Sequence, residues 1–286
     1  SDMIHPIPLV HPNLKLLSHS SDQIEDSCQR KYQIYKLRPS FGSLDYDDSS
    51  IDMDFGSLIG IGIQEYLKDK NVESAYWSMF NSWSRVLDDE EGLDKKKTFW
   101  HGMIAIDKFK LFCLEELRNL ELVSFNGIPA IELGFCIDCG DGFFYRGKVD
   151  AIMWNGTHSS LIPLECKTTG SWNIHEAMYK NQGQASGYKL IVDAISKMLN
   201  VEIQNTYKVI YTVYQSKQQQ WNQFEFPKTT GNLTRWVKNL LVRKQRIQIA
   251  AENQFWPMNG NSCYNYNRPC KYFGLCEMKD EMLFGV

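Results

Sequence analysis

The sequence predicts an α/β protein with a mixed β-sheet at its centre and helices around it. Residues 1–50 are expected to be irregular apart from one short helix, and apolar residues recur at helical spacing over 73–122, interrupted by a charged stretch over 88–95 that we expect to be a loop. The period then changes to that of β-strands over 130–167, and a helix and two further strands follow. Helices before a strand meander, and a helix with strands after it, are typical of a sheet covered by helices.

The N-terminal part is expected to be mainly helical. A short helix is predicted over 21–35 and a longer one over 55–70. In the longer helix, Gly60 and Gly62 allow another group to approach the backbone closely.

The strands that follow are predicted from β-type runs separated by turn residues. Turns are expected over 139–141 and over 155–157, where Asn155-Gly156 is a strong hairpin signal. The strands are predicted over 130–138, 142–154, 160–167, 207–214 and 221–226, with helices over 174–199 and 233–250.

Length and composition indicate an ordinary globular chain. Of its 286 residues, 43% are hydrophobic and 23% charged, and no run approaches the roughly 20 apolar residues of a membrane helix. The start lacks a basic region followed by an apolar run, so we expect an intracellular, cytoplasmic protein without membrane attachment. The net charge of −3 gives no global sign of nucleic-acid binding, although a local basic groove can form on an acidic protein.

Two carboxylates and a lysine are predicted to meet on neighbouring strands. Asp150 closes a strand-like run, and Glu165 and Lys167 stand two apart on the next strand, so they share a face. Pairing through the hairpin would bring Asp150 close to both. Paired carboxylates suit a hard divalent cation such as Mg²⁺ or Mn²⁺, beside which Lys167 can orient water and counter charge on a phosphate. The alternative is a charge pair on an exposed strand face.

Three more residues are candidates for this site. Glu132 is a carboxylate in the apolar segment Ile131-Glu132-Leu133, and is either a further metal ligand or a surface residue. Gln184 and Tyr188 are four apart and share one face of the helix that follows. That face is expected to lean over the site.

Together these motifs resemble those of the RecB-like PD-(D/E)xK nucleases. The resemblance covers about the central half of the chain and rests on the ordered series Phe55-Gly56-Ser57, Glu132, Gly147-Lys-Val-Asp150, Glu165-Cys-Lys167-Thr168 and Gln184-Ala-Ser-Gly-Tyr188. It implies a restriction-endonuclease-like core, metal binding by Asp150 and Glu165, catalysis by Lys167, and site-shaping roles for Gln184 and Tyr188.

The chain departs from this family pattern at one position. Many relatives carry a metal-binding histidine shortly after the Phe-Gly element, where this chain has Gly60. Gln64 and Glu65 follow: one alternative is that either compensates for the histidine, and the simpler interpretation is that both are polar residues on a helix face. The number of catalytic metal ions therefore stays open.

Four cysteines near the chain ends form a second candidate site. Cys263, Cys270 and Cys276 are close together in the tail, which suggests ligation of a metal or cluster, and Cys28 is the candidate fourth ligand. Four thiolates suit a [4Fe–4S] cluster or Zn²⁺, and free buried thiols are the alternative. The resemblance to iron–sulfur-containing nucleases, CRISPR-associated and AddB-type, favours the cluster, although the spacing before Cys270 is wider than usual.

The resemblance implies one nuclease domain over 1–286. Its mainly helical part covers 1–125, its catalytic α/β core 126–230, and its helix and cysteine tail 231–286. The remaining cysteines are not expected to be ligands: Cys136 and Cys139 lie across a strand end without a second pair, and Cys166 should point into the core.

The function that follows is metal-dependent hydrolysis of DNA phosphodiesters, acting from ends as a phage or recombination-type exonuclease. The expected partner is DNA that is single-stranded or has single-stranded ends, and a homo-oligomer or a recombination protein is compatible with the resemblance. A basic run over 235–246 is a candidate phosphate track. The alternative function is a non-catalytic DNA-binding or assembly subunit; a redox protein would leave the carboxylates unexplained.

Overall fold

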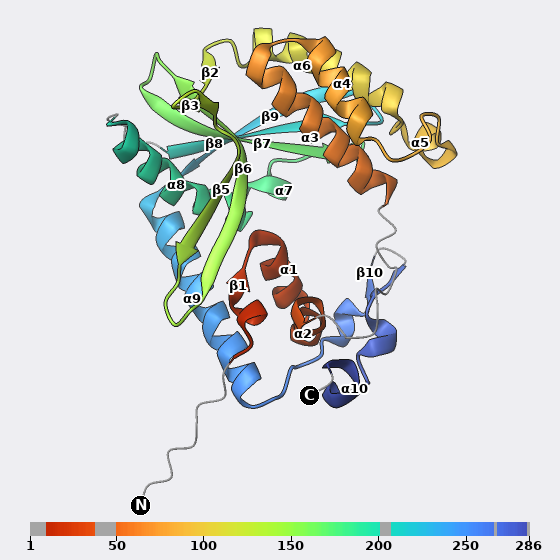
Figure 1. The fold of residues 1–286 in the computed structure, drawn as a ribbon, viewed down its shortest axis with the longest axis vertical. Helices are drawn as coiled ribbons and strands as arrows, with labels where there is room; N and C mark the ends of the chain where they lie inside the picture. Colours follow the sequence, from red (N-terminus) through yellow and green to blue (C-terminus); the bar gives the residue numbers. More distant parts are fainter. Residues whose placement is uncertain (1–9, 38–49, 201–206, 266–267, 285–286) are drawn as a thin grey trace, which may run out of the picture. The chain divides into compact units, whose positions relative to one another are not determined.

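The structure is a computed structural model that describes residues 10–37, 50–200, 207–265 and 268–284 (Figure 1). The chain divides into two compact units. Unit 1 comprises Ser1–Asp48, Phe135–Gly147 and Thr234–Val286, and unit 2 comprises Ser49–Gly134 and Lys148–Leu233. No helix in the described ranges combines the length and the apolar character needed to cross a bilayer.

A mixed β-sheet is the central element, as the sequence predicts. Within the described residues it has seven strands: β1 pairs in parallel with β6, β6 is antiparallel to β7, β7 runs parallel to β8, and β8 is antiparallel to β9. Strands β2 and β5 also pair with β6. The strand bounds are β1 Leu16–Leu17, β2 Leu120–Leu122, β5 Ile131–Asp138, β6 Phe144–Asn155, β7 Ser160–Thr169, β8 Tyr207–Gln215 and β9 Gln220–Lys228.

Helices pack against this sheet in unit 2. Helix α3 contacts β7, and α4 and α6 pack on α3. A Cβ atom on Gly62 would lie 2.6 Å from Met79 of α4 and 2.7 Å from Ile106 of α6, so glycine is what permits this three-helix contact. The bounds are α3 Ile51–Asp69, α4 Val72–Ser82, α5 Glu90–Lys95, α6 Phe99–Glu115, α7 Ala177–Lys180 and α8 Gly183–Leu199, with a short hairpin of β3 (Ser124–Phe125) and β4 (Ile128–Pro129).

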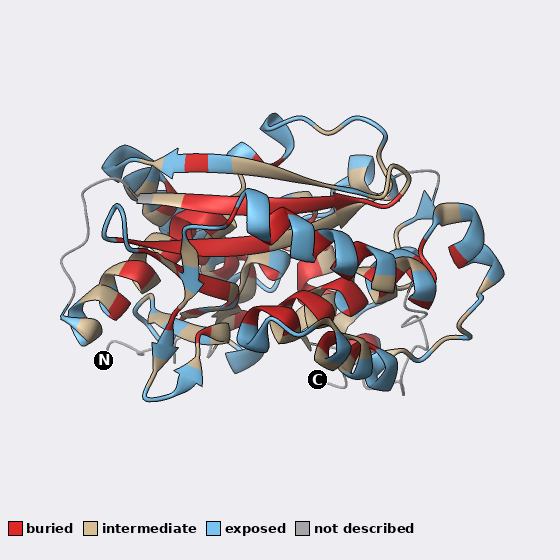
Figure 2. Cartoon of the chain, turned by 90° about the horizontal axis from the view of Figure 1, so that it is seen from above, coloured by how far each residue is buried: buried red, intermediate tan, exposed pale blue. Residues whose placement is uncertain are grey.

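The core of unit 2 is formed by the inner faces of these helices and by the strands, which carry most of the buried positions in Figure 2. Phe55, Ile59 and Ile63 of α3 pack with Phe109 of α6 and Leu164 of β7, and all five side chains are almost fully buried. Burial of this apolar surface fixes α3 against β7 and therefore positions the residues that the two elements share at the candidate site.

Unit 1 joins segments from both ends of the chain. It contains α1 and α2, most of α9 and the cysteine-bearing tail. The bounds are η1 Pro12–Lys15, α1 His19–Ser27, α2 Gln29–Leu37, α9 Thr230–Glu252, η2 Gly260–Ser262, β10 Tyr264–Asn265, β11 Arg268–Pro269, η3 Phe273–Leu275 and α10 Asp280–Phe284.

The second half of the basic run of α9 forms ion pairs within unit 1, which the sequence did not predict. Arg243 contacts Asp22 at 3.0 Å and Asp26 at 2.5 Å, and it is mostly buried. Arg246 pairs with Glu25 and Asp26, and Lys244 pairs with Asp141 at 2.6 Å. These contacts hold α9 to α1 and to the β5–β6 turn. Arg235 and Lys238, in the first half of the run, are exposed and take no part in these ion pairs.

Three helix predictions were wrong in detail. The charged stretch expected to be a loop contains α5, because the Asp89 carboxylate accepts a hydrogen bond from the Gly92 amide at 2.9 Å and caps the helix. The single helices expected over 21–35 and 174–199 are each two helices, broken at Cys28 and at Gln182, which have extended backbone conformations. Periodicity continues across such breaks of one or two residues and does not reveal them.

Candidate active site

Asp150, Glu165 and Lys167 come together on β6 and β7 of unit 2. The strands are antiparallel with Ala151 opposite Leu164, which sets Asp150 beside the start of the Glu165-Cys166-Lys167 segment. The Asp150 carboxylate accepts a hydrogen bond of 2.8 Å from the Cys166 amide. The Lys167 ammonium lies 2.5 Å from Oε1 of Glu165, whose side chain is almost fully buried. The predicted meeting of the three side chains is thus present, while their roles stay a prediction.

Helix α8 supplies the other side of this cluster. The Tyr188 hydroxyl lies 2.7 Å from Oε2 of Glu165 and 3.1 Å from the Lys148 carbonyl oxygen, and donates to one of these acceptors. It accepts a hydrogen bond of 2.5 Å from Gln184 Nε2, while Gln184 Oε1 accepts from the Lys167 ammonium at 3.4 Å. The helix face predicted to lean over the site therefore fixes Glu165 and Lys167.

Burial controls the charges here. It raises the pKa of Asp150 to about 7, and the neighbouring Glu165 carboxylate adds to this shift. Burial disfavours the charged form of Lys167, but the carboxylates of Glu165 and Asp150 outweigh it and raise the pKa of the ammonium group. Lys167 is therefore a cation at neutral pH, so it can donate hydrogen bonds but is not suited to accept a proton.

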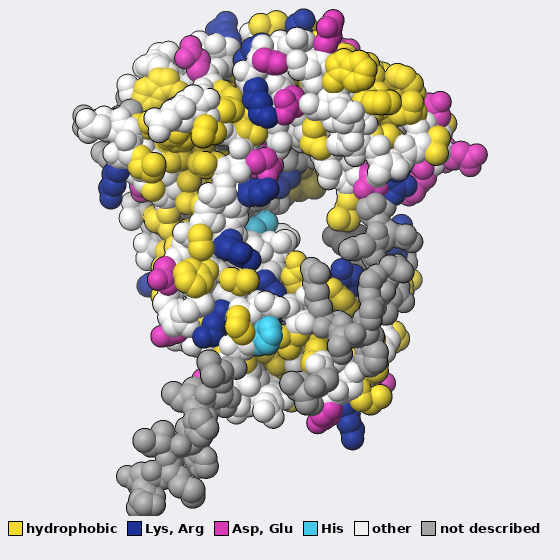
Figure 3. Space-filling model, viewed as in Figure 1, with side chains coloured by type: hydrophobic (Ala, Val, Ile, Leu, Met, Phe, Trp, Pro, Cys, Tyr) yellow, Lys and Arg dark blue, Asp and Glu magenta, His cyan; other side chains and the backbone are white. Residues whose placement is uncertain are grey.

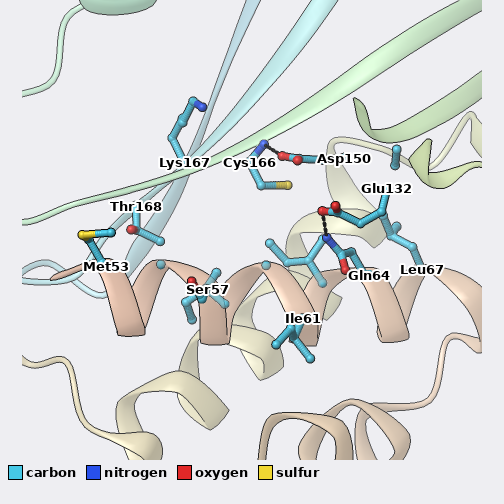
Figure 4. Close-up of a pocket in the computed structure, with 15 residues that line it drawn as sticks. Met53, Ser57, Ile61, Gln64, Leu67, Glu132, Asp150, Cys166, Lys167 and Thr168 are labelled. Carbon is cyan, nitrogen blue, oxygen red and sulfur yellow. Dashed lines mark hydrogen bonds between the residues drawn. The ribbon is translucent and has the colours of Figure 1, made fainter. Parts of the chain in front are cut away.

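A cavity of about 770 Å³ opens on the face of β7 next to α3 (Figure 4). Asp150, Lys167 and Thr168 line it from the sheet, and Gly56 and Gly60 line it from the helix. A Cβ atom on Gly56 would stand 3.3 Å from the Thr168 hydroxyl, whereas one on Gly60 would meet nothing within 4 Å. Gly60, which stands where many of the nucleases that the sequence resembles carry histidine, thus borders open space at the cavity wall.

Glu132 and Gln64 meet in this cavity, which the interpretation of Gln64 as a helix-face residue missed. Gln64 Nε2 of α3 donates a hydrogen bond of 2.6 Å to Oε1 of Glu132 (Figure 4), and the Lys148 ammonium lies 3.1 Å from Oε2. Glu132 has a left-handed backbone with φ of 49°, which is uncommon for a residue other than glycine and recurs at functional sites. Glu65, by contrast, pairs with Lys68 on the helix surface as expected.

The donor set fits a hydrated divalent cation better than a closed metal cage. Among the described residues, no three side chains of the His, Cys, Asp or Glu type come close enough to hold a metal ion, so Glu132, Asp150 and Glu165 do not form a three-ligand group. Mg²⁺, however, typically uses one or two carboxylates and keeps several waters. The half-buried Asp150 and the buried Glu165 supply hard oxygen ligands. Burial, and after it the Glu165 carboxylate, raises the pKa of Asp150, and a bound cation would oppose both effects.

The four candidate cysteines all belong to unit 1. The Cys270 amide donates to the Cys263 carbonyl at 2.7 Å, and the Asn259 amide lies 3.5 Å from the Cys28 sulfur. Burial raises the pKa of the Cys276 thiol, and the other three thiols add to the shift, so all four are near neighbours. Among the described residues no three such side chains are placed to hold a single metal ion, so the group that these thiols would bind stays a prediction.

The remaining cysteines agree with their predictions in part. Cys166 packs against the hydrophobic core, and its sulfur accepts a hydrogen bond of 3.2 Å from the Thr212 hydroxyl. It also lines the cavity beside α3, whereas the Glu165 side chain, one residue before it, contacts Tyr188 of α8. Cys136 is exposed and Cys139 partly buried, both as free thiols.

Comparison with known proteins relates this chain to others by its fold. No protein-family model and no curated protein matches it. The chain is similar to the crystal structure of a "putative exonuclease" from Eubacterium rectale, with a TM-score of 0.51, 11% identity, and coverage of 92% of this chain and 93% of that chain. The structure of SSO0001 is matched over 66% of this chain and 73% of that chain at 13% identity, with a TM-score of 0.30. The first match shows a shared nuclease-like α/β fold.

Proposed function

We propose that the protein is a metal-dependent deoxyribonuclease of the PD-(D/E)xK kind that hydrolyses phosphodiester bonds from DNA ends. The observation that carries the proposal is the pairing of two buried or half-buried carboxylates, Asp150 and Glu165, with the Lys167 ammonium 2.5 Å from Glu165. The shared fold with a protein described as an exonuclease is consistent with it.

Each residue has a definite task in this reaction. Asp150 and Glu165 would hold Mg²⁺ or Mn²⁺, with Glu132 beside them; the cation, when bound, polarises the phosphodiester and eases deprotonation of the attacking water. Lys167 donates hydrogen bonds to the phosphate and offsets the charge that develops on it. Tyr188 and Gln184 keep Glu165 and Lys167 in place.

A cleavage assay with end-labelled DNA tests this proposal. We expect degradation of linear single- or double-stranded DNA in Mg²⁺ or Mn²⁺ but not in EDTA, and loss of at least 100-fold on Asp150→Asn or Lys167→Ala, a typical effect of removing a charge-stabilising group. Lys180→Ala is the matched control, since this lysine is exposed and pairs with Glu176. Circular DNA should resist, because it has no ends.

Two outcomes would contradict the proposal. No cleavage of any substrate by folded wild-type protein would favour the non-catalytic DNA-binding or assembly subunit. Equal cleavage rates of wild type and both variants would show that Asp150 and Lys167 do not form the active site. Cleavage of circular DNA as fast as linear DNA would be compatible with the nuclease activity but would overturn the proposal that the protein acts from DNA ends.

We further propose that four cysteines, Cys28, Cys263, Cys270 and Cys276, hold a [4Fe–4S] cluster. Its role would be structural, because hydrolysis needs no electron transfer. The proximity of the four thiols in unit 1 supports it. Protein purified without oxygen should contain about four irons and four sulfides per chain. Cys276→Ser should lose them, whereas Cys136→Ser, which changes an exposed thiol, should not. Bound zinc in place of iron would overturn the cluster assignment.

A further inference from the structure

Trp172 is an exposed indole on a tightly fixed loop just beyond the candidate active site. It lies between β7, which carries Lys167 and ends at Thr169, and α7. Its side chain is 64% exposed. Five residues of chain span at most about 18 Å, so the Cα atoms of Trp172 and Lys167 lie within the length of a few nucleotides of one strand.

The backbone of this loop is held at several points. The carbonyl oxygen of Trp172 accepts hydrogen bonds from Gln215 Nε2 at 3.0 Å and from Gln218 Nε2 at 2.6 Å. Gln215 also donates to the Ser171 carbonyl at 3.0 Å, and the Ser171 hydroxyl donates to the Asn173 carbonyl at 2.7 Å. The loop presents the indole from a fixed backbone.

Gln215 is itself fixed, which makes the support rigid. It is buried at the end of β8, and its Oε1 accepts hydrogen bonds from Gln220 at 3.1 Å and Asn222 at 2.8 Å. A rigid aromatic side chain loses little conformational entropy on binding a flat ligand. Exposure of a large indole on such a support is typical of a stacking surface for unpaired bases.

The charges beside the loop suit a nucleic-acid strand. The exposed Lys96 donates to the carbonyl oxygen of Lys217 at 3.0 Å, and Lys217 directly precedes Gln218. Neither lysine forms an ion pair within the described residues. An aromatic platform next to cations is the combination that binds single-stranded nucleic acid through bases and phosphates together.

We propose that Trp172 stacks on an unpaired base of the DNA strand held in the active site, and that this contact gives the protein its affinity for single-stranded ends. The proposal rests on the proposed nuclease function and adds the form of the substrate that the site selects.

A second exposed tryptophan, Trp77, provides a contrast. Trp77 is 67% exposed and packs edge-to-face on Phe80. Both belong to α4, which with α6 carries several exposed hydrophobic side chains, and hydrophobic side chains gather on this side of unit 2 in Figure 3. Glu73, one helical turn before Trp77, is exposed and would repel a phosphate. Trp77 is therefore a matched control in exposure and residue type.

The test is binding of a labelled single-stranded oligonucleotide in EDTA, where cleavage does not interfere. Trp172→Ala should weaken binding about fivefold to 150-fold, the range for loss of one base–aromatic stack. Trp172→Phe should keep most of the affinity, and Trp77→Ala should leave it unchanged. Blunt duplex binding should not respond to Trp172→Ala.

Oligonucleotides with one abasic position identify the contact as a stack. At one position of the oligonucleotide, removal of the base should weaken its binding to wild type but leave its binding to Trp172→Ala unchanged. Equal single-strand affinity of wild type and Trp172→Ala, or equal losses in Trp172→Ala and Trp77→Ala, would overturn the stacking role. Metal-dependent cleavage by wild type in a parallel assay separates that result from failure of the nuclease function, in which no cleavage occurs whether or not the oligonucleotide is bound.

Discussion

Gln64 of α3 and Glu132 of β5, 68 positions apart in the chain, are joined by a hydrogen bond of 2.6 Å. The other oxygen of Glu132 faces the exposed ammonium of Lys148 at 3.1 Å. Gln64 therefore holds the carboxylate toward the cavity, and Lys148 attracts it toward solvent. Gly60 stands one helical turn before Gln64, so α3 supplies a hydrogen-bond donor to a strand carboxylate close to its glycine at the cavity wall.

Gln64→Leu should weaken metal activation. Without the Gln64 donor, Lys148 is the remaining partner of the Glu132 carboxylate. Loss of such a supporting partner typically weakens metal affinity about 10- to 100-fold. We expect the Mn²⁺ concentration for half-maximal cleavage to rise by that factor, with little change in rate at saturating Mn²⁺. The neighbouring variant Glu65→Gln, on the helix surface, is the control. An unchanged Mn²⁺ requirement would show that Gln64 has no part in the site.

Tyr188→Phe should destabilise unit 2. The change leaves Oε2 of the buried Glu165 and Nε2 of Gln184 without the hydroxyl, and an unsatisfied buried polar group costs about 1–3 kcal/mol. Tyr211→Phe is the matched control, because the buried Tyr211 hydroxyl has no hydrogen-bond partner among the described residues. Urea unfolding measures the free energy of unfolding of both variants. Similar values for the two would be inconsistent with the hydrogen bonds assigned to the Tyr188 hydroxyl.

The sequence predicts the strands and the carboxylate cluster because both depend on local patterns. Alternation and the Asn155-Gly156 turn define the β6–β7 hairpin, and that hairpin alone brings Asp150 to the Glu165 strand. The order and bounds of β5 to β9 follow the predicted ones within a few residues. The ligating roles still depend on the resemblance and on experiment.

Contacts between distant segments account for what the sequence does not reveal. The pairing of Gln64 with Glu132 needs α3 to pack beside β5, and no spacing in the sequence reports that. Arg243 and Arg246 belong to a basic run, but their partners in α1 lie more than 200 positions away. A charge run in sequence therefore does not distinguish a phosphate track from a set of internal ion pairs.

Arg243→Gln should act on stability, not on the salt dependence of DNA binding. Its mostly buried guanidinium contacts Asp22, Glu25 and Asp26, and removing one partner of a buried ion pair typically destabilises by about 3–5 kcal/mol. Lys238→Gln, an exposed change in the same helix, should alter stability by less than about 0.5 kcal/mol. Guanidinium unfolding compares them; equal midpoints would contradict a structural role for Arg243.

Asp22→Asn should change how stability depends on pH. Burial, with Asp26 and Glu25 adding and Arg243 opposing, raises the pKa of Asp22 from 3.8 to about 7. The folded protein thus retains a proton that the unfolded chain has released, so the stability from this group is lost as pH rises from about 4 to about 7. Asparagine does not ionise, and the melting temperature of the variant relative to wild type should increase between pH 5 and pH 8. Asp26→Asn, at a half-exposed position in the same cluster, controls for the loss of an ion pair; a constant difference between Asp22→Asn and wild type across this range would mean that Asp22 is ionised throughout it.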